Sequence, residues 1–171
     1  MDAPAGVSIR PWGEGDLPLL RRLLGDPAMT EHLGGPETEE QLVSRHQRYC
    51  AIAAGGGPGH VFVITAGPDA IDAGSVLYWE ATSNDTPIWE IGWSVLPEFQ
   101  GRGIAARGTE LAMEHAAAQR RHRWMHAFPD LANTASNRLC ERLGFEIVEV
   151  VEFEYPKGTW RTGNNWRRAL W

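Results

Sequence analysis

Hydrophobic and polar residues alternate along this chain with two different periods, and these periods predict the order of its strands and helices. Residues 89–95 place apolar side chains at every second position, with Glu90, Gly92 and Ser94 between them. This alternation predicts a half-buried strand over residues 86–97. Apolar runs bounded by turn residues predict further strands at residues 8–11, 60–65, 74–80, 123–128, 146–155 and 165–170.

Four other segments space their apolar residues three and four apart, which is typical of helices. These segments are residues 16–26, 38–53, 103–119 and 134–143. Asp16 and Pro18 suit the start of the first helix, and Gly25 suits its end. Thr38 and Gln41 have the spacing of a capping box, which predicts the start of the second helix.

The predicted order is β-α-α-β-β-β-α-β-α-β-β, with hairpins before and after a central β-α-β unit. This order predicts an α/β (α+β) fold, with a mixed and mostly antiparallel sheet of about seven strands and about four helices on its two faces. At 171 residues the chain is long enough for one well-packed domain and short for two. We therefore expect a single domain over residues 1–171.

Composition narrows the class of partner. Hydrophobic residues make up 43% and charged residues 22% of the chain, as in ordinary globular proteins. The net charge of -6 argues against binding to nucleic acid or to acidic membranes, which requires a basic surface. The two cysteines form no metal-binding pattern, and we expect no metal. Without an apolar signal segment at the start or a membrane-length apolar run, we expect a cytoplasmic protein.

The stretch PEFQGRGIAARG, residues 97–108, places glycines directly before a predicted helix. Such a turn lets backbone N–H groups approach a phosphate. Gly101, Gly103 and Ala106 match the dinucleotide-binding pattern G-x-G-x-x-A, with Asp130 after the next strand. That pattern requires its first glycine directly after a strand and belongs to a fold with several β-α-β units. Here a longer connection intervenes and only one such unit is evident, which disfavours a nicotinamide dinucleotide.

Residues 100–105, QGRGIA, resemble the acetyl-coenzyme A signature R/Q-x-x-G-x-G/A of the GNAT superfamily of N-acetyltransferases. Upstream, EIGWSVLP resembles the fourth strand of that family. Downstream, residues 133–145, NTASNRLCERLGF, resemble its N-x-x-S/A segment ending in G-F, and residues 8–27 resemble its first strand and helix. The resemblance covers most of the chain and is closest to the ribosomal-protein N-terminal acetyltransferases, the RimJ/RimL-like branch. It implies the GNAT fold, with coenzyme A bound at the central β-α-β unit.

The resemblance also implies which residues hold the cofactor. In the family, the pantetheine arm lies between two splayed parallel strands, here residues 88–95 and 123–128, and the pyrophosphate lies on the glycine turn. The residues that the resemblance and the turn place against acetyl-coenzyme A are Ser94, Val95, Leu96, Gln100, Gly101, Arg102, Gly103, Ile104, Ala105, Ala106, Asn133 and Ser136.

Glu90 is the candidate general base, because neighbouring tryptophans can raise the pKa of its carboxyl group by excluding water. The alternatives for Glu90 are a solvated residue or an ion pair with an arginine. Ser136 is the candidate acid for the departing thiolate, and hydrogen bonding at the start of a helix is the structural alternative for both Ser136 and Asn133. Many family members carry a tyrosine acid where this chain has Cys140. The acid step then falls to Ser136, to water or to a tyrosine such as Tyr155.

Glu80, Trp93 and Trp160 are the candidate acceptor-binding residues, since an aromatic pocket with acidic groups suits a cationic amine. Trp160 lies in an expected loop, residues 156–164, without an evident place in the core. We expect an acetyl-CoA-dependent N-acetyltransferase that acts directly on a primary amine, either a small molecule (amino acid, polyamine or antibiotic) or a protein N-terminus. The alternative is a noncatalytic acyl-CoA-binding module. Both a monomer and a homodimer fit the sequence.

Overall fold

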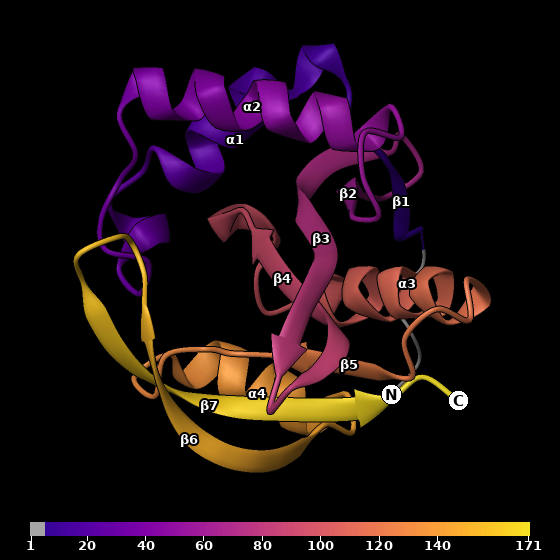
Figure 1. The fold of residues 1–171 in the computed structure, drawn as a ribbon. Helices are drawn as coiled ribbons and strands as arrows, with labels where there is room; N and C mark the ends of the chain where they lie inside the picture. The colour runs from indigo at the N-terminus through magenta and orange to yellow at the C-terminus, as the bar shows by residue number, and fades with distance from the viewer. Residues whose placement is uncertain (1–5) are drawn as a thin grey trace.

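The computed structural model describes residues 6–171 and joins seven strands in one sheet of order β1-β2-β3-β4-β5-β7-β6 (Figure 1). The strands are β1 (Ser8–Pro11), β2 (His60–Ala66), β3 (Ile71–Ser83), β4 (Thr86–Val95), β5 (Trp124–Ala127), β6 (Glu146–Glu154) and β7 (Trp160–Ala169). The helices are α1 (Leu17–Leu24), α2 (Glu39–Ala53), α3 (Ile104–Ala118) and α4 (Thr134–Arg142), with 3-10 turns at Glu14–Asp16, Ala28–Thr30 and Pro97–Phe99. Every neighbouring pair of strands is antiparallel except β4 and β5. The predicted mixed and mostly antiparallel sheet is therefore confirmed.

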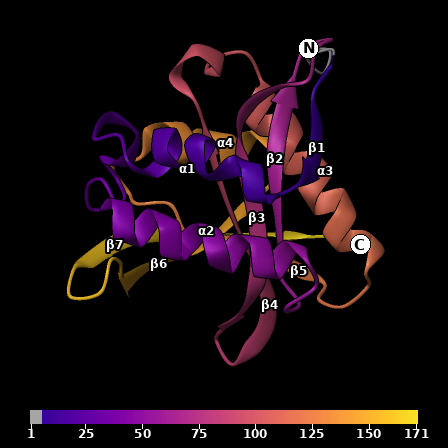
Figure 2. The ribbon, with the colours of Figure 1, turned by 90° about the horizontal axis from the view of Figure 1, so that it is seen from above.

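The helices cover both faces of the sheet, α1 and α2 on one side and α3 on the other (Figures 1 and 2). Strand β2 shows why the sequence requires two layers. Val61 and Val63 pack with the leucines of α1 and α2, whereas Phe62 and Ile64 pack in the core that contains α3 and α4. A strand that is apolar at every position can be buried only when both of its faces are covered.

The ends of several elements differ from the prediction, and β3 in particular covers Ile71–Ser83 where a strand over residues 74–80 was expected. Asp16 precedes α1 but makes no side-chain cap; its carboxylate instead pairs with Arg10 and accepts a hydrogen bond from the N–H of Gly13. Strand β7 begins at Trp160, within the segment expected to be a loop. After Trp160, residues 161–164 are polar or glycine and lack an apolar alternation, but the segment pairs with β6, and this pairing extends the strand.

The described chain contains no helix, from residue 6 onward, that combines the length and the apolar character needed to cross a membrane.

Candidate active site

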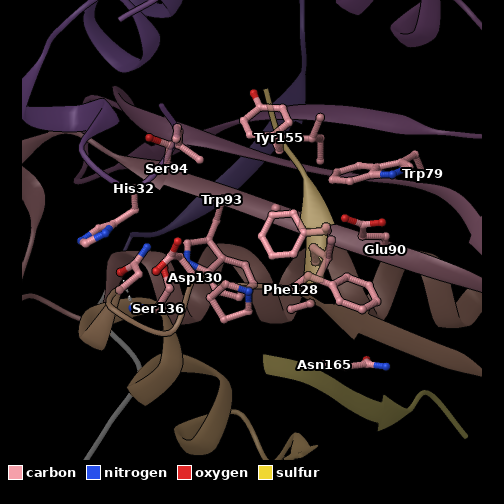
Figure 3. Close-up of a pocket in the computed structure, with 18 of the residues that line it drawn as sticks. His32, Trp79, Glu90, Trp93, Ser94, Phe128, Asp130, Ser136, Tyr155 and Asn165 are labelled. Carbon is pink, nitrogen blue, oxygen red and sulfur yellow. Dashed lines mark hydrogen bonds between the residues drawn. The ribbon is translucent and has the colours of Figure 1, made fainter. Parts of the chain in front are cut away.

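The two parallel strands of the sheet separate part of the way along their length. β4 and β5 are joined at Trp89–Met125 and Glu90–His126, and within residues 6–171 no further ladder pair follows these two. β4 nevertheless continues to Val95, with its other edge paired to β3. The gap opens into a cavity of about 820 Å³, and residues 91–94 lie along it (Figure 3). The strands are thus splayed, as the family resemblance implied.

Helix α3 begins at the glycine turn that follows β4, and it has no side-chain cap. Its N-cap Gly103 and the preceding Gly101 have left-handed backbone, with φ of 76° and 70°. The first turn of α3 contains no acidic residue. Because the first N–H groups of a helix have no partner within it and lie at the positive end of its dipole, this turn fits a pyrophosphate. The residues that meet there are Gly101, Arg102, Gly103, Ile104, Ala105 and Ala106.

Part of the expected contact with the pantetheine arm is corrected by the structure. Ser94 lines the cavity, but Val95 and Leu96 do not. The carbonyl of Val95 accepts a hydrogen bond of 2.8 Å from the side chain of Gln100, and the N–H of Leu96 donates to the carbonyl of Ala73, also at 2.8 Å. These three predicted residues therefore hold the turn in place, and their paired groups do not face a ligand.

Glu90 lies on β4 at the point where the strands separate, and it lines the cavity. Burial raises the pKa of its carboxyl group to about 7, while a hydrogen bond from Trp79, which is opposite Glu90 on β3, lowers it slightly. No charged partner contributes to this shift, so an ion pair with an arginine is not the explanation for Glu90. A carboxyl group with this pKa can take and release a proton near neutral pH.

The N-terminal turn of α4 forms the other side of the cavity. Asn133 is the N-cap of α4, and its side chain accepts a hydrogen bond of 3.1 Å from the N–H of Ser136. Both residues also line the cavity. Asn133 therefore forms the helix-start hydrogen bond that was the structural alternative to cofactor binding. Its side chain also lines the cavity where the cofactor is predicted to bind. In Figure 3, Ser136 and Glu90 lie toward different ends of the drawn group, with Trp93 and Phe128 between them.

Asn137 was not predicted, and it fixes α4 to the sheet. Its amide nitrogen donates to the carbonyls of Asp130 and Asn133, at 2.9 and 2.8 Å. Its amide oxygen accepts hydrogen bonds of 2.9 Å from Asn164 and from the indole of Trp166. The partners on β7 are distant in sequence, so no local spacing pointed to them. This network orients the helix turn that carries the predicted cofactor residues.

Cys140, which replaces the usual tyrosine, is a core residue. It is fully buried, and burial raises the pKa of its thiol to about 12. Tyr155 instead lines the cavity, and its hydroxyl accepts a hydrogen bond of 3.4 Å from Arg45. Of the alternatives considered for the acid step, Ser136 and Tyr155 therefore face the cavity, whereas the Cys140 thiol does not.

Glu80 does not lie in the cavity, which corrects its predicted role. It is opposite Trp89 on β4, and Trp89 is buried in the core on the side of α3. Glu80 therefore belongs to the sheet face opposite that of Glu90, because neighbouring positions on a strand point to opposite faces. There its carboxylate forms an ion pair with Arg121 and a hydrogen bond of 2.7 Å with the imidazole of His122.

The predicted tryptophans divide between the cavity and the outer surface. Trp93 lines the cavity together with Trp79, as expected for an aromatic wall. Trp160 lies at the first position of β7 opposite Glu154, with 70% of its surface exposed, and it does not line the cavity. Its predicted acceptor contact is therefore corrected as well.

Several cavity residues escaped the sequence analysis because they come from segments outside the family motifs. Strand β6 contributes three glutamates and two apolar or aromatic residues, and the connection between α1 and α2 contributes a histidine. These residues are Glu149, Val151, Glu152, Phe153, Glu154 and His32. The repeated glutamates of EIVEVVEFE were the available signal in the sequence. They indicate a cavity wall only once β6 is known to lie beside the cavity. In the described part of the chain, His, Cys, Asp and Glu form no group of three that could hold a metal ion.

Known proteins share this fold and part of its sequence pattern. A solved structure of spermidine N-acetyltransferase from Vibrio cholerae, in complex with CoA and spermine, is 15% identical, with 97% of this chain and 96% of that chain covered and a TM-score of 0.79. The ribosomal-protein-alanine N-acetyltransferase from Brucella melitensis is 24% identical, with 95% and 99% covered and a TM-score of 0.75.

A further similar structure is the acetyltransferase from Salmonella typhimurium that modifies the N-terminal serine of the ribosomal protein L7/L12. It is 21% identical, with 96% of this chain and 95% of that chain covered and a TM-score of 0.78. At these identities the structures show a shared fold. The model of the acetyltransferase (GNAT) domain family matches residues 7–146, which span most of the sheet, the glycine turn and α4. The chain therefore belongs to the GNAT acetyltransferase family.

Proposed function

We propose that this protein transfers the acetyl group of acetyl-coenzyme A directly to a cationic primary amine, with Glu90 as general base and Ser136 as general acid. The position of Glu90 carries this proposal. Its carboxyl group, with a pKa of about 7, lies where the two central strands separate and in the same cavity as the N-terminus of α4. Coenzyme A fits this site because the uncapped first turn of α3 offers N–H groups without a competing carboxylate.

The reaction follows from these positions. The acceptor arrives as an ammonium ion, and the carboxylate of Glu90 accepts its proton, directly or through water. The amine nitrogen then attacks the thioester carbon, and N–H groups on the unpaired edge of β4 are the candidate donors to the oxyanion. When the carbonyl re-forms and the C–S bond breaks, the hydroxyl of Ser136 protonates the thiolate. The nitrogen of the new amide gives up its second proton, which returns to Ser136 through water. Glu90 returns its proton to solvent after the product leaves.

Charge around the cavity supports a cationic acceptor. Glu90, Glu149, Glu152 and Glu154 all line it, and aromatic side chains form much of the remaining wall. The main basic group at the cavity, Arg45, already forms an ion pair with Glu37. Acidic and aromatic walls attract ammonium groups. Both a polyamine and a protein N-terminus meet this description, and relatives of the same fold act on each class.

An acceptor screen tests the proposal. Release of coenzyme A thiol from acetyl-coenzyme A is measured with a panel of polyamines, amino acids, aminoglycosides and peptides with free N-termini. We expect release with at least one cationic amine, and product mass spectrometry should show acetylation of the amine nitrogen. Activity confined to anionic acceptors would contradict the proposed acceptor class.

The second candidate function is a noncatalytic acyl-CoA-binding module. The replacement of the usual tyrosine acid by the buried Cys140 favours it. The same screen separates the two candidates, since a module would bind coenzyme A tightly in a calorimetric titration and release no thiol with any amine.

A further inference from the structure

The hairpin between β3 and β4 ends in a tight turn. Ser83 and Thr86 are the last paired residues, and Asn84 and Asp85 between them have left-handed backbone, with φ of 47° and 60°. Two left-handed residues form the turn that matches the twist of a hairpin, and Asn and Asp tolerate this conformation better than most side chains. The sequence of the turn thus fixes its shape without help from neighbouring elements.

This turn reaches a distant part of the sheet. The amide of Asn165 on β7 donates a hydrogen bond of 3.3 Å to the hydroxyl of Ser83, and the amide of Asn84 donates one of 3.1 Å to the carboxylate of Glu149 on β6. β3 is a sheet neighbour of neither β6 nor β7. Figure 1 shows the end of β3 lying against β7. The hairpin therefore reaches across β5 to the two strands on its far side.

The crossing closes one end of the cavity that contains Glu90. Thr82, Ser83 and Asn84 line this cavity, together with their partners on β6 and β7. Followed backward from the glycine turn, β4 passes first Ser94, then Glu90 and then the hairpin turn. A thioester that enters from the glycine turn thus meets the acceptor near Glu90, and the hairpin lies beyond the acceptor.

We infer that the β3–β4 turn is the end wall of the acceptor site, and that the bridge from Asn84 to Glu149 limits the length of the amine that the site accepts. This inference rests on the proposed function. Both bridging residues are exposed, and one hydrogen bond between exposed groups adds little to stability. The bridge can therefore be removed without unfolding the protein, and a longer chain can then extend past the wall.

Substitutions at the turn test the inference, because they can keep the left-handed backbone. Asn84→Gly removes the donor, and Asn84→Asp replaces it with a carboxylate that repels Glu149. Asp85→Asn changes the other turn residue, which does not line the cavity, and is the matched control. The double variant Asn84→Asp with Glu149→Gln exchanges donor and acceptor and should restore the bridge.

The acceptors are linear alkylamines and α,ω-diamines with two to eight carbons. We expect the wild-type kcat/KM to fall sharply above one chain length. In Asn84→Gly and Asn84→Asp this limit should move to longer chains, with kcat/KM for the first excluded amine rising about tenfold, the effect of one or two methylene groups in a pocket. The control should behave as wild type, and the double variant should return the length limit to its wild-type position. A wild type without a length limit, or an equal limit in all variants, would overturn the inference.

A binding measurement separates this inference from the proposed function. The same amines are titrated calorimetrically into each variant saturated with coenzyme A. If thiol is never released, the proposed function fails, while a length limit in binding that shifts with Asn84 would still support the end wall. Acetylation with an unshifted limit in both rate and binding would contradict the end wall alone.

Discussion

The two halves of the candidate site are built from different parts of the chain. The coenzyme half consists mainly of backbone, namely the glycine turn, the first N–H groups of α3 and the unpaired edge of β4. The acceptor half consists of side chains from β3, β6, β7 and the connection between α1 and α2. Backbone groups are the same in every sequence that folds this way, whereas side chains change with each substitution. One scaffold can thus keep its donor and change its acceptor.

The largest effect is expected for a substitution of Glu90, which should lower the rate of acetyl transfer and leave the binding of coenzyme A unchanged. Glu90→Gln removes the proton acceptor and keeps the size of the side chain. We expect kcat/KM for the amine to fall about 10²- to 10⁴-fold, the usual contribution of general base catalysis. The dissociation constant of coenzyme A, measured by calorimetry, should change less than twofold, because the coenzyme half is formed elsewhere.

The matched control for this substitution is Glu80→Gln. Glu80 lies on the neighbouring strand β3, and its side chain is on the opposite face of the sheet from Glu90. The variant loses an exposed ion pair and should keep wild-type kinetics. Equal losses in the two variants would show that the position of Glu90 in the cavity is irrelevant.

A backbone change should affect the coenzyme half alone. Gly103→Ala places a side chain on a left-handed residue, φ 76°, which costs about 1–2 kcal/mol unless the turn shifts. If the turn shifts, its N–H groups move, and we expect KM for acetyl-coenzyme A to rise about 5- to 30-fold. The KM for the amine should stay within about twofold of wild type in steady-state kinetics.

Gly144→Ala provides the comparison, since Gly144 has the same φ of 76° and open space around it. Both variants should lose similar thermal stability. Only Gly103→Ala should weaken coenzyme A binding, and an equal loss of affinity in Gly144→Ala would point to a general loss of stability.

The pH dependence of kcat/KM should report the ionisation of Glu90 in the acceptor half. Because the pKa of Glu90 is raised from 4.5 to about 7, kcat/KM should fall about tenfold per pH unit below pH 7 and level off above it. Glu90→Gln should lack this limb. The folded protein favours the neutral carboxyl group, so its stabilising contribution is complete below pH 4.5 and is lost as the pH rises to about 7. Denaturant unfolding of both proteins across this range measures the loss. A limb that persists in Glu90→Gln would assign the base to another group.

The smallest effect is expected at Cys140, which belongs to neither half. Cys140→Ala should keep kcat/KM within about twofold of wild type and lower the free energy of unfolding by about 1 kcal/mol, because the core loses a buried sulfur. In the folded wild type, the Cys140 thiol should resist a thiol reagent that reacts with Cys50, which is partly exposed. Loss of thiol release in this variant would indicate an acetyl-cysteine intermediate.

The sequence predicted the parts of the site that lie within one segment. The glycine turn, the strand with Glu90 and the turn from Asn133 to Ser136 each follow from local spacing, and the structure brings the last two to one cavity. Alternation on a strand also placed Glu90 away from the core face.

The remaining parts depend on contacts between distant segments. Asn84 and Glu149 are 65 residues apart, and nothing near either one indicates the other. Glu80 and Trp160 have residue types suited to an amine pocket, but strand parity and the extension of β7 place them outside it. Residue type therefore predicts a role only after the topology has fixed which face a residue occupies.

The separation of β4 from β5 also bears on aggregation. Unpaired strand edges attract other chains, and the two outer edges of this sheet show the usual protection: β1 has four residues, and β6 carries repeated glutamates. The inner edge along residues 91–94 has no such protection and must keep its N–H and C=O groups free. It lies inside the molecule, where a foreign strand cannot enter but a thin linear ligand with amide groups can. The fold thus keeps this unpaired strand edge away from the strands of other proteins, while a linear ligand can still reach it.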